Sequence, residues 1–101
     1  MSTTTLHLIA SSPFATDALA SCVRLLGEGD GLLLCGEAVN ALRPQAAASA
    51  VLATLPAGCQ LFVLEEDALA RAIAIEAPVQ SVDYPDFVAL TLQFDKVNSW
   101  L

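Results

Sequence analysis

The chain has 101 residues and a formal net charge of −7, and 55% of its residues are hydrophobic. This length accommodates a single domain, residues 1–101, because two domains of half the size would each bury too small a core. Eleven carboxylates stand against only four basic residues, Arg24, Arg43, Arg71 and Lys96. So few basic residues exclude a surface that follows a phosphate backbone, and we expect no direct contact with nucleic acid.

The hydrophobic content is high for so short a chain, and we expect the surplus to lie in subunit interfaces. No stretch of about twenty apolar residues occurs, so we expect no membrane span. The first fifteen residues lack a basic region followed by a long apolar run, and we expect no secretory signal. Three cysteines without a CxxC pair, together with one histidine, favour reduced thiols in the cytoplasm. We assign no metal and no cofactor.

The first half of the chain alternates apolar runs with helical patterns. Residues 6–10 form an apolar run bounded by turn residues, which predicts a strand buried on both faces. A helix is predicted for residues 14–26, with Ser12 as its N-cap and Pro13 in its first turn. At 100° per residue, its inner face carries Ala15, Leu19, Cys22, Val23 and Leu26, widened by Phe14, Ala18 and Leu25.

The segment 27–31, GEGDG, predicts the end of this helix and a turn, because it lies after a helix and before a strand. That setting does not match a dinucleotide-binding loop, which follows a strand. A second buried strand is predicted for residues 32–35. Two helices should follow, at 37–42 and at 45–55, the latter from its run of alanines.

The second half continues the alternation. Strands are predicted at 60–64 and 79–82, with a helix from 65 to about 75 in which Asp67 pairs with Arg71. Asp83 should cap a last helix running to about Phe94, with an inner stripe of Phe87, Leu90, Thr91 and Phe94. The pattern predicts a single-domain α/β fold, with a mainly parallel sheet of four to five strands and helices on both faces.

Five residues are candidates for a chemical or interface role. The position of His7 in the middle of the first strand favours a core histidine over a general base. Cys35 ends a strand at the carboxyl edge of the sheet, where a helix N-terminus could lower its pKa, although Glu37 would oppose this. Cys59 precedes a strand at the opposite edge and is expected to be inert. Cys22 lies on the apolar helix face, where a free cysteine acts as a small hydrophobe, and Trp100 either closes the core or anchors an interface.

Several motifs in order resemble the TusB/DsrH family of small sulfur-relay proteins over the whole length. They are LH at 6–7, SPF at 12–14, GDGLLL at 29–34, VLEEDALAR at 63–71, VDYPDFV at 82–88 and the final WL. Ser21-Cys22-Val23 matches a cysteine that DsrH-like members carry in the first helix. The family tends to have glycine after the Ala-Arg pair, where this chain has Ala72.

The resemblance implies a cytoplasmic subunit of a heterohexamer, with TusC/DsrF-like and TusD/DsrE-like partners. Such complexes relay sulfur as cysteine persulfides to a downstream sulfur-carrier protein and finally to 2-thiouridine at the tRNA wobble position. The principal persulfide cysteine belongs to the TusD/DsrE-like partner. This chain would be mainly structural, with Cys22 as an accessory persulfide site.

Other functions remain open at the level of sequence. A DsrH-type subunit could instead serve sulfur oxidation. A freestanding thiol-redox protein would use Cys35 and would show rapid alkylation of that thiol at neutral pH. A signalling receiver domain shares the alternation of strands and helices, but it needs a lysine on a late strand. The single lysine, Lys96, falls in the predicted tail, which disfavours this class.

Overall fold

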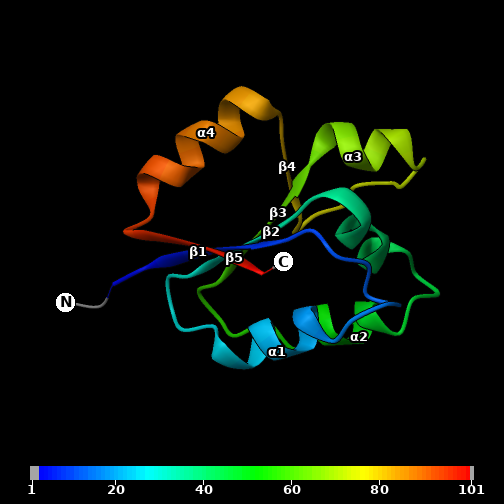
Figure 1. Cartoon of the computed structure of the whole chain (residues 1–101), viewed down its shortest axis with the longest axis horizontal. Helices are drawn as coiled ribbons and strands as arrows, with labels where there is room; N and C mark the ends of the chain where they lie inside the picture. Colours follow the sequence, from blue (N-terminus) through cyan, green and yellow to red (C-terminus); the bar gives the residue numbers. More distant parts are fainter. Residues whose placement is uncertain (1–2, 101) are drawn as a thin grey trace.

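The computed structural model describes residues 3–100, which form a five-stranded, fully parallel sheet with helices on both faces (Figure 1). The predicted fold class is therefore confirmed. The strands are β1 (Thr5–Ile9), β2 (Gly31–Leu34), β3 (Gln60–Leu64), β4 (Gln80–Val82) and β5 (Lys96–Trp100). The helices are α1 (Ala18–Leu25), the 3-10 helix η1 (Gly36–Leu42), α2 (Ala48–Leu52), α3 (Glu65–Ala70) and α4 (Tyr84–Gln93).

The strand order is β4-β3-β2-β1-β5. Strands β2, β3 and β4 are therefore added in turn on one side of β1, and β5 is added on its other side. The helices α1 and α2 lie on one face, and α4 crosses the opposite face to bring the chain back from β4 to β5 (Figure 1). Right-handed crossovers require this change of face when the direction of strand addition reverses. Of the helices within residues 3–100, none is long and apolar enough to cross a membrane.

The sheet separates two clusters of buried side chains, because successive residues of a strand point to opposite faces. The larger cluster joins Ile9, Leu32, Leu34 and Val63 of the sheet to the inner side of α1. The smaller cluster joins alternate strand residues to the inner stripe of α4, and consists of Leu6, Leu33, Phe62, Leu64, Val82 and Leu90, with Phe87 and Phe94 packed against it. The predicted inner stripe of the last helix is confirmed for Phe87, Leu90 and Phe94.

The first helix is shorter than predicted. Helix α1 begins at Ala18, and Ser12 does not cap it. Instead the Ser12 hydroxyl accepts from the Phe14 amide at 3.1 Å, and the Thr16 hydroxyl accepts from the Ala18 amide at 3.4 Å. These local side-chain bonds offer the backbone an alternative to helical pairing. Phe14 is consequently 69% exposed instead of lying on an inner face, and Ala15 and Leu25 are exposed as well.

The predicted helices at 37–42, 45–55 and 65–75 also differ in detail. The first is a 3-10 helix, and the second is reduced to the five residues of α2. Helix α3 ends at Ala70, because Ala72 adopts a φ of 53°. The amide of Ile73 donates to the Ala68 carbonyl at 3.0 Å, and the Ala72 amide donates to Leu69 at 3.1 Å. This bonding pattern is a Schellman ending, in which glycine is the preferred residue at the position of Ala72.

The segment after Phe94, predicted as a tail, contains the fifth strand. Strand β5 pairs with β1 in parallel along its whole length. Its start is fixed by Asp95, whose carboxylate accepts from the Thr4 amide at 2.8 Å, and by the Lys96 amide, which donates to the Thr4 carbonyl at 3.1 Å. Four of the five β5 residues are exposed, so the apolar run that marks a buried strand is absent here. Asp83 caps α4 as predicted, accepting from the Asp86 amide at 2.8 Å.

Replacing Ala72 with glycine should raise the free energy of unfolding by about 1 kcal/mol, because a left-handed φ costs an L-residue roughly 1–2 kcal/mol that glycine avoids, less its own entropic cost. Urea denaturation measures the change. The matched control is Ala70→Gly at the end of α3, which should lower stability by about 0.5 kcal/mol. An Ala72→Gly variant no more stable than the wild type would contradict the strain argument.

Candidate functional site

The carboxyl edge of the sheet, where parallel sheets place their sites, holds Cys35 directly after β2. The Cys35 thiol donates to the Ile9 carbonyl at 3.6 Å and is half-buried beside the smaller core cluster. Gly36 opens η1 with a φ of 52°. Its amide would be the natural donor to a Cys35 thiolate, but it donates to the Asp67 carboxylate at 2.7 Å.

A helix N-terminus could have lowered the pKa of Cys35, but the pKa of this thiol is raised. Burial and the Asp67 charge both raise the pKa of the Cys35 thiol, with burial the larger cause. A neutral thiol is a poor nucleophile, because the thiolate is the reactive form. The predicted pairing of Asp67 with Arg71 is wrong, because the Arg71 guanidinium binds Glu37 and the Asp67 carbonyl instead.

Cys22 lies on the inner side of α1 and is 0% exposed. It packs in the larger cluster with Ile9 and Leu34, as the periodicity of the helix predicted. Burial, together with the Asp30 charge, raises the pKa of this thiol to about 12. In this chain Cys22 is a small core residue, and a persulfide on it would need α1 to open from the sheet.

Cys59 lies at the amino edge of the sheet, as predicted, and its thiol donates to the Gly27 carbonyl at 3.1 Å. It is partly exposed, and burial, Asp30 and Glu28 raise its pKa in that order. All three cysteines are free thiols. The three thiols thus lie on different segments of the fold, and each has a raised pKa.

Asp30 joins two separate parts of the fold, although the sequence predicts only a turn at this position. Its carboxylate is buried and accepts from the Thr5 amide at 2.9 Å and from the Gly27 amide at 2.9 Å. It therefore joins the start of β1 to the segment that follows α1. The GDG context marked the turn, but the bond to Thr5 spans 25 residues and left no local signal.

His7 lies within β1, 6% exposed, on the side of Asp30. Its Nδ1 accepts from the Trp100 indole at 3.0 Å, and its Nε2 lies 3.9 Å from the Asp30 carboxylate. Nδ1 therefore carries no proton, and burial lowers the pKa of the imidazole more than Asp30 raises it. The structure agrees with a core histidine, and it places Trp100 against the chain's own core.

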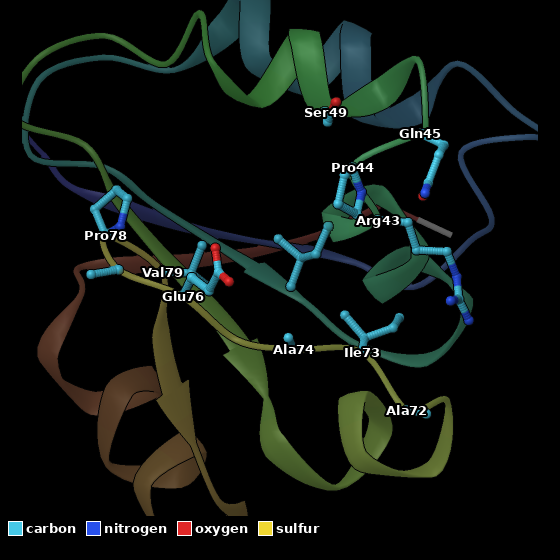
Figure 2. Close-up of a pocket in the computed structure, with 12 residues that line it drawn as sticks. Arg43, Pro44, Gln45, Ser49, Ala72, Ile73, Ala74, Glu76, Pro78 and Val79 are labelled. Carbon is cyan, nitrogen blue, oxygen red and sulfur yellow. The ribbon is translucent and has the colours of Figure 1, made fainter.

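A cavity of about 640 Å³ lies between η1, α2 and the segment that precedes β4. Figure 2 shows its two charged residues, Arg43 and Glu76, on opposite sides. The Arg43 guanidinium already donates to the Asn40 side chain at 2.9 Å and to the Arg71 carbonyl at 3.1 Å. No cysteine lines this cavity, so it is not a binding site that includes one of the thiols. Within residues 3–100, no group of acidic, His and Cys side chains is placed to hold a metal ion.

A family model described as "DsrH like protein" matches residues 11–97. Protein TusB of Escherichia coli O81 (strain ED1a) is 36% identical over 97 residues, covering 94% of this chain and 99% of that protein. The chain belongs to the DsrH family. Membership in this family and the likeness to TusB support a role as a subunit of a sulfur-relay complex.

Solved structures share the fold. The YchN protein from E. coli superposes with a TM-score of 0.77 at 19% identity, covering 98% of this chain and all of that one. The MTH1491 protein from Methanobacterium thermoautotrophicum gives a TM-score of 0.71 at 14% identity, covering 97% of this chain and 99% of that one. At these identities the likeness concerns the arrangement of the elements, and the five-stranded sheet with its α4 crossover is therefore a shared scaffold.

Replacing Asp67 with asparagine should increase the alkylation rate of Cys35 at neutral pH severalfold. The amide oxygen can still accept from Gly36, while the negative charge that raises the thiol pKa is removed. Peptide mapping after timed iodoacetamide treatment reads each cysteine separately. Glu66→Gln on the same helix is the matched control and should leave the rate unchanged. Equal rates in Asp67→Asn and the wild type would show that burial alone governs Cys35.

Acidification should destabilise the chain through His7. Its folded pKa lies below the ordinary value of 6.5, so the unfolded chain binds more protons below that pH. This contribution is present above about pH 6.5 and is lost as the pH falls toward the folded pKa. The melting temperature should therefore fall more steeply between pH 7.5 and pH 5 for the wild type than for His7→Gln. The amide oxygen of the glutamine can still accept from Trp100. Parallel curves would contradict this assignment.

Proposed function

We propose that this chain is a structural subunit of a heterohexameric sulfurtransferase complex in the cytoplasm, with TusC/DsrF-like and TusD/DsrE-like partners. The complex relays persulfide sulfur to a downstream carrier protein, and the sulfur ends as 2-thiouridine at the tRNA wobble position. The observation that carries this proposal is the match of almost the whole chain to the DsrH family and to TusB. The state of the thiols supports the structural role, because each of the three cysteines has a raised pKa and the chain offers no activated thiolate of its own.

A second observation supports a role without direct tRNA binding. The basic residues are few, and two of them are engaged within the chain. Arg71 pairs with Glu37, and Arg43 binds the side chain of Asn40 and the carbonyl of Arg71. A phosphate backbone would find no cluster of free basic side chains here. In the proposed complex, the tRNA is handled by another component.

Cys22 enters this proposal as an accessory persulfide site, because it alone matches a cysteine of the family pattern. A persulfide there requires α1 to move when the subunits assemble, since the thiol is fully buried in the isolated chain. The structural reading of Cys22 requires no such movement. The freestanding redox alternative with Cys35 has less support, because Asp67 takes the amide that would stabilise a Cys35 thiolate.

Co-expression with the two homologous partner chains should yield a stable complex, measured by native mass spectrometry. In a strain that lacks this chain, tRNA 2-thiouridine should fall to background and return with the wild-type chain. A Cys22→Ala chain should assemble, and its thiouridine level decides between the two roles of this residue: full recovery assigns a structural role, and loss assigns sulfur transfer.

Two outcomes would count against the proposal. The absence of a complex on co-expression would remove the subunit assignment. Unchanged 2-thiouridine without this chain, alongside a complex that does form, would retain the subunit role and direct the sulfur to oxidation chemistry instead.

A further inference from the structure

Strand β5 forms one end of the sheet, and its outer edge pairs with no other strand of residues 3–100. The strand at the other end, β4, has three residues and lies shortly after Pro78. Short strands and prolines are common ways of protecting a sheet edge. Strand β5 has five residues and contains no proline. Its outer edge therefore offers backbone amides and carbonyls to a further strand.

The pairing with β1 determines which backbone groups face this edge. In a parallel pair, every second residue of a strand directs both its amide and its carbonyl to the neighbouring strand. The Lys96 amide donates to the Thr4 carbonyl at 3.1 Å, so Lys96 and every second residue after it face β1. Val97 and Ser99 lie between these residues, and they direct their amides and carbonyls outward. The free edge thus carries the backbone groups of Val97 and Ser99.

The side chains of β5 leave both of its faces largely open. Its first four residues are exposed, and Trp100 is half-buried against the larger cluster. Lys96 and Asn98 lie on the same face as Trp100, because side chains alternate along a strand. Within β5 the single charged residue is Lys96, and there is no carboxylate. Charges of the strand itself therefore do not oppose a second strand with the same sequence.

The sequence of β5 is complementary to itself in antiparallel orientation. When Asn98 lies opposite Asn98 of a second copy, Val97 lies opposite Ser99, and their outward amides and carbonyls bond to one another. The same register places Lys96 directly opposite Trp100 of the second copy, on one face of the sheet. An ammonium group beside an indole ring is a favourable cation–π pair. A shift by one residue would oppose Val97 to a residue whose backbone groups are already bound to β1.

We propose that β5 pairs in antiparallel orientation with β5 of a second copy of this chain, about a two-fold axis at Asn98. The two five-stranded sheets then join into one continuous sheet. This inference goes beyond the proposed function, since a heterohexamer with equal numbers of three different chains holds two copies of each. It names the contact between the two copies of this chain. The pairing requires no other chain, so it can be tested on this chain alone.

Cysteine substitution tests the register. In Asn98→Cys the two new thiols would face each other in a non-hydrogen-bonded antiparallel pair, whose Cα separation of about 4.5 Å suits a disulfide. Oxidised glutathione should therefore link the full-length chain into dimers, measured on a non-reducing gel against the wild-type background. Lys96→Cys is the matched control, because residue 96 lies opposite Trp100 and not opposite itself. It should give at least about tenfold less dimer than Asn98→Cys.

The ionic strength provides a second readout for Asn98→Cys. Two chains that each carry a net charge of −7 repel each other at a distance. Salt screens this repulsion, so the dimer yield should rise between about 50 and 500 mM NaCl. A contact held mainly by attraction between opposite charges would instead weaken, and that result would contradict the pairing of two identical strands.

A further pair of variants tests the backbone bonds. Ser99→Pro removes an outward amide, which an edge strand tolerates because this amide faces away from its neighbour. Combined with Asn98→Cys, it should reduce the dimer yield about tenfold or more. Ser99→Ala keeps the amide and should leave the yield unchanged. Circular dichroism verifies folding, and Val97→Pro replaces Ser99→Pro if the latter does not fold.

Three outcomes would overturn the inference. The first is an Asn98→Cys yield no higher than the wild-type background, and the second is an equal yield from Lys96→Cys. The third is undiminished crosslinking of Asn98→Cys in a folded chain that also carries Ser99→Pro. The proposed function is tested separately, because it depends on assembly with the two partner chains.

Discussion

Much of this structure depends on the two hydrogen bonds that the buried carboxylate of Asp30 accepts. The carboxylate holds the amino end of β1 through Thr5 and the segment after α1 through Gly27, so that α1 and the two central strands meet at a fixed point. Burial raises the pKa of Cys22 and Cys59, and the Asp30 charge adds to this effect for both. One side chain thus joins parts of the amino edge of the sheet and contributes to the raised pKa of two of the three thiols. At the carboxyl edge, the Asp67 charge likewise adds to burial in raising the pKa of Cys35.

The parts of the fold that sequence could predict are those with a local signal. Apolar runs marked β1 to β3, and the spacing of Phe87 and Leu90 marked the buried side of α4. Strand β5 had no such run, because it is an edge strand with four exposed residues, held by pairing to β1 and by Asp95. Helix ends were misjudged where Ser12 and Thr16 bond to nearby amides, and where Ala72 takes a conformation that its residue type does not suggest.

The candidate site shows the same division. The burial of Cys22 followed from helical periodicity alone. The raised pKa of the Cys35 thiol did not, because Asp67, whose charge contributes to it and which accepts from the Gly36 amide, lies 31 positions from that amide along the chain. The bond between Trp100 and His7 spans 93 positions and likewise left no pattern to read. Family resemblance predicted the sulfur-relay context, whereas the contacts that raise the pKa of each thiol appear only in the folded chain.

The position of β5 has a consequence for the order of folding during synthesis. Strand β1, near the amino terminus, lies inside the sheet only because the last strand of the chain covers one of its edges. While the ribosome still encloses residues 96–100, the amides and carbonyls along that edge of β1 have no strand to pair with. The pairing of β1 is therefore completed late in folding, since contacts so distant in sequence form slowly. Helix α4 directly precedes β5, so its final seating on the sheet also awaits the pairing of β5 with β1.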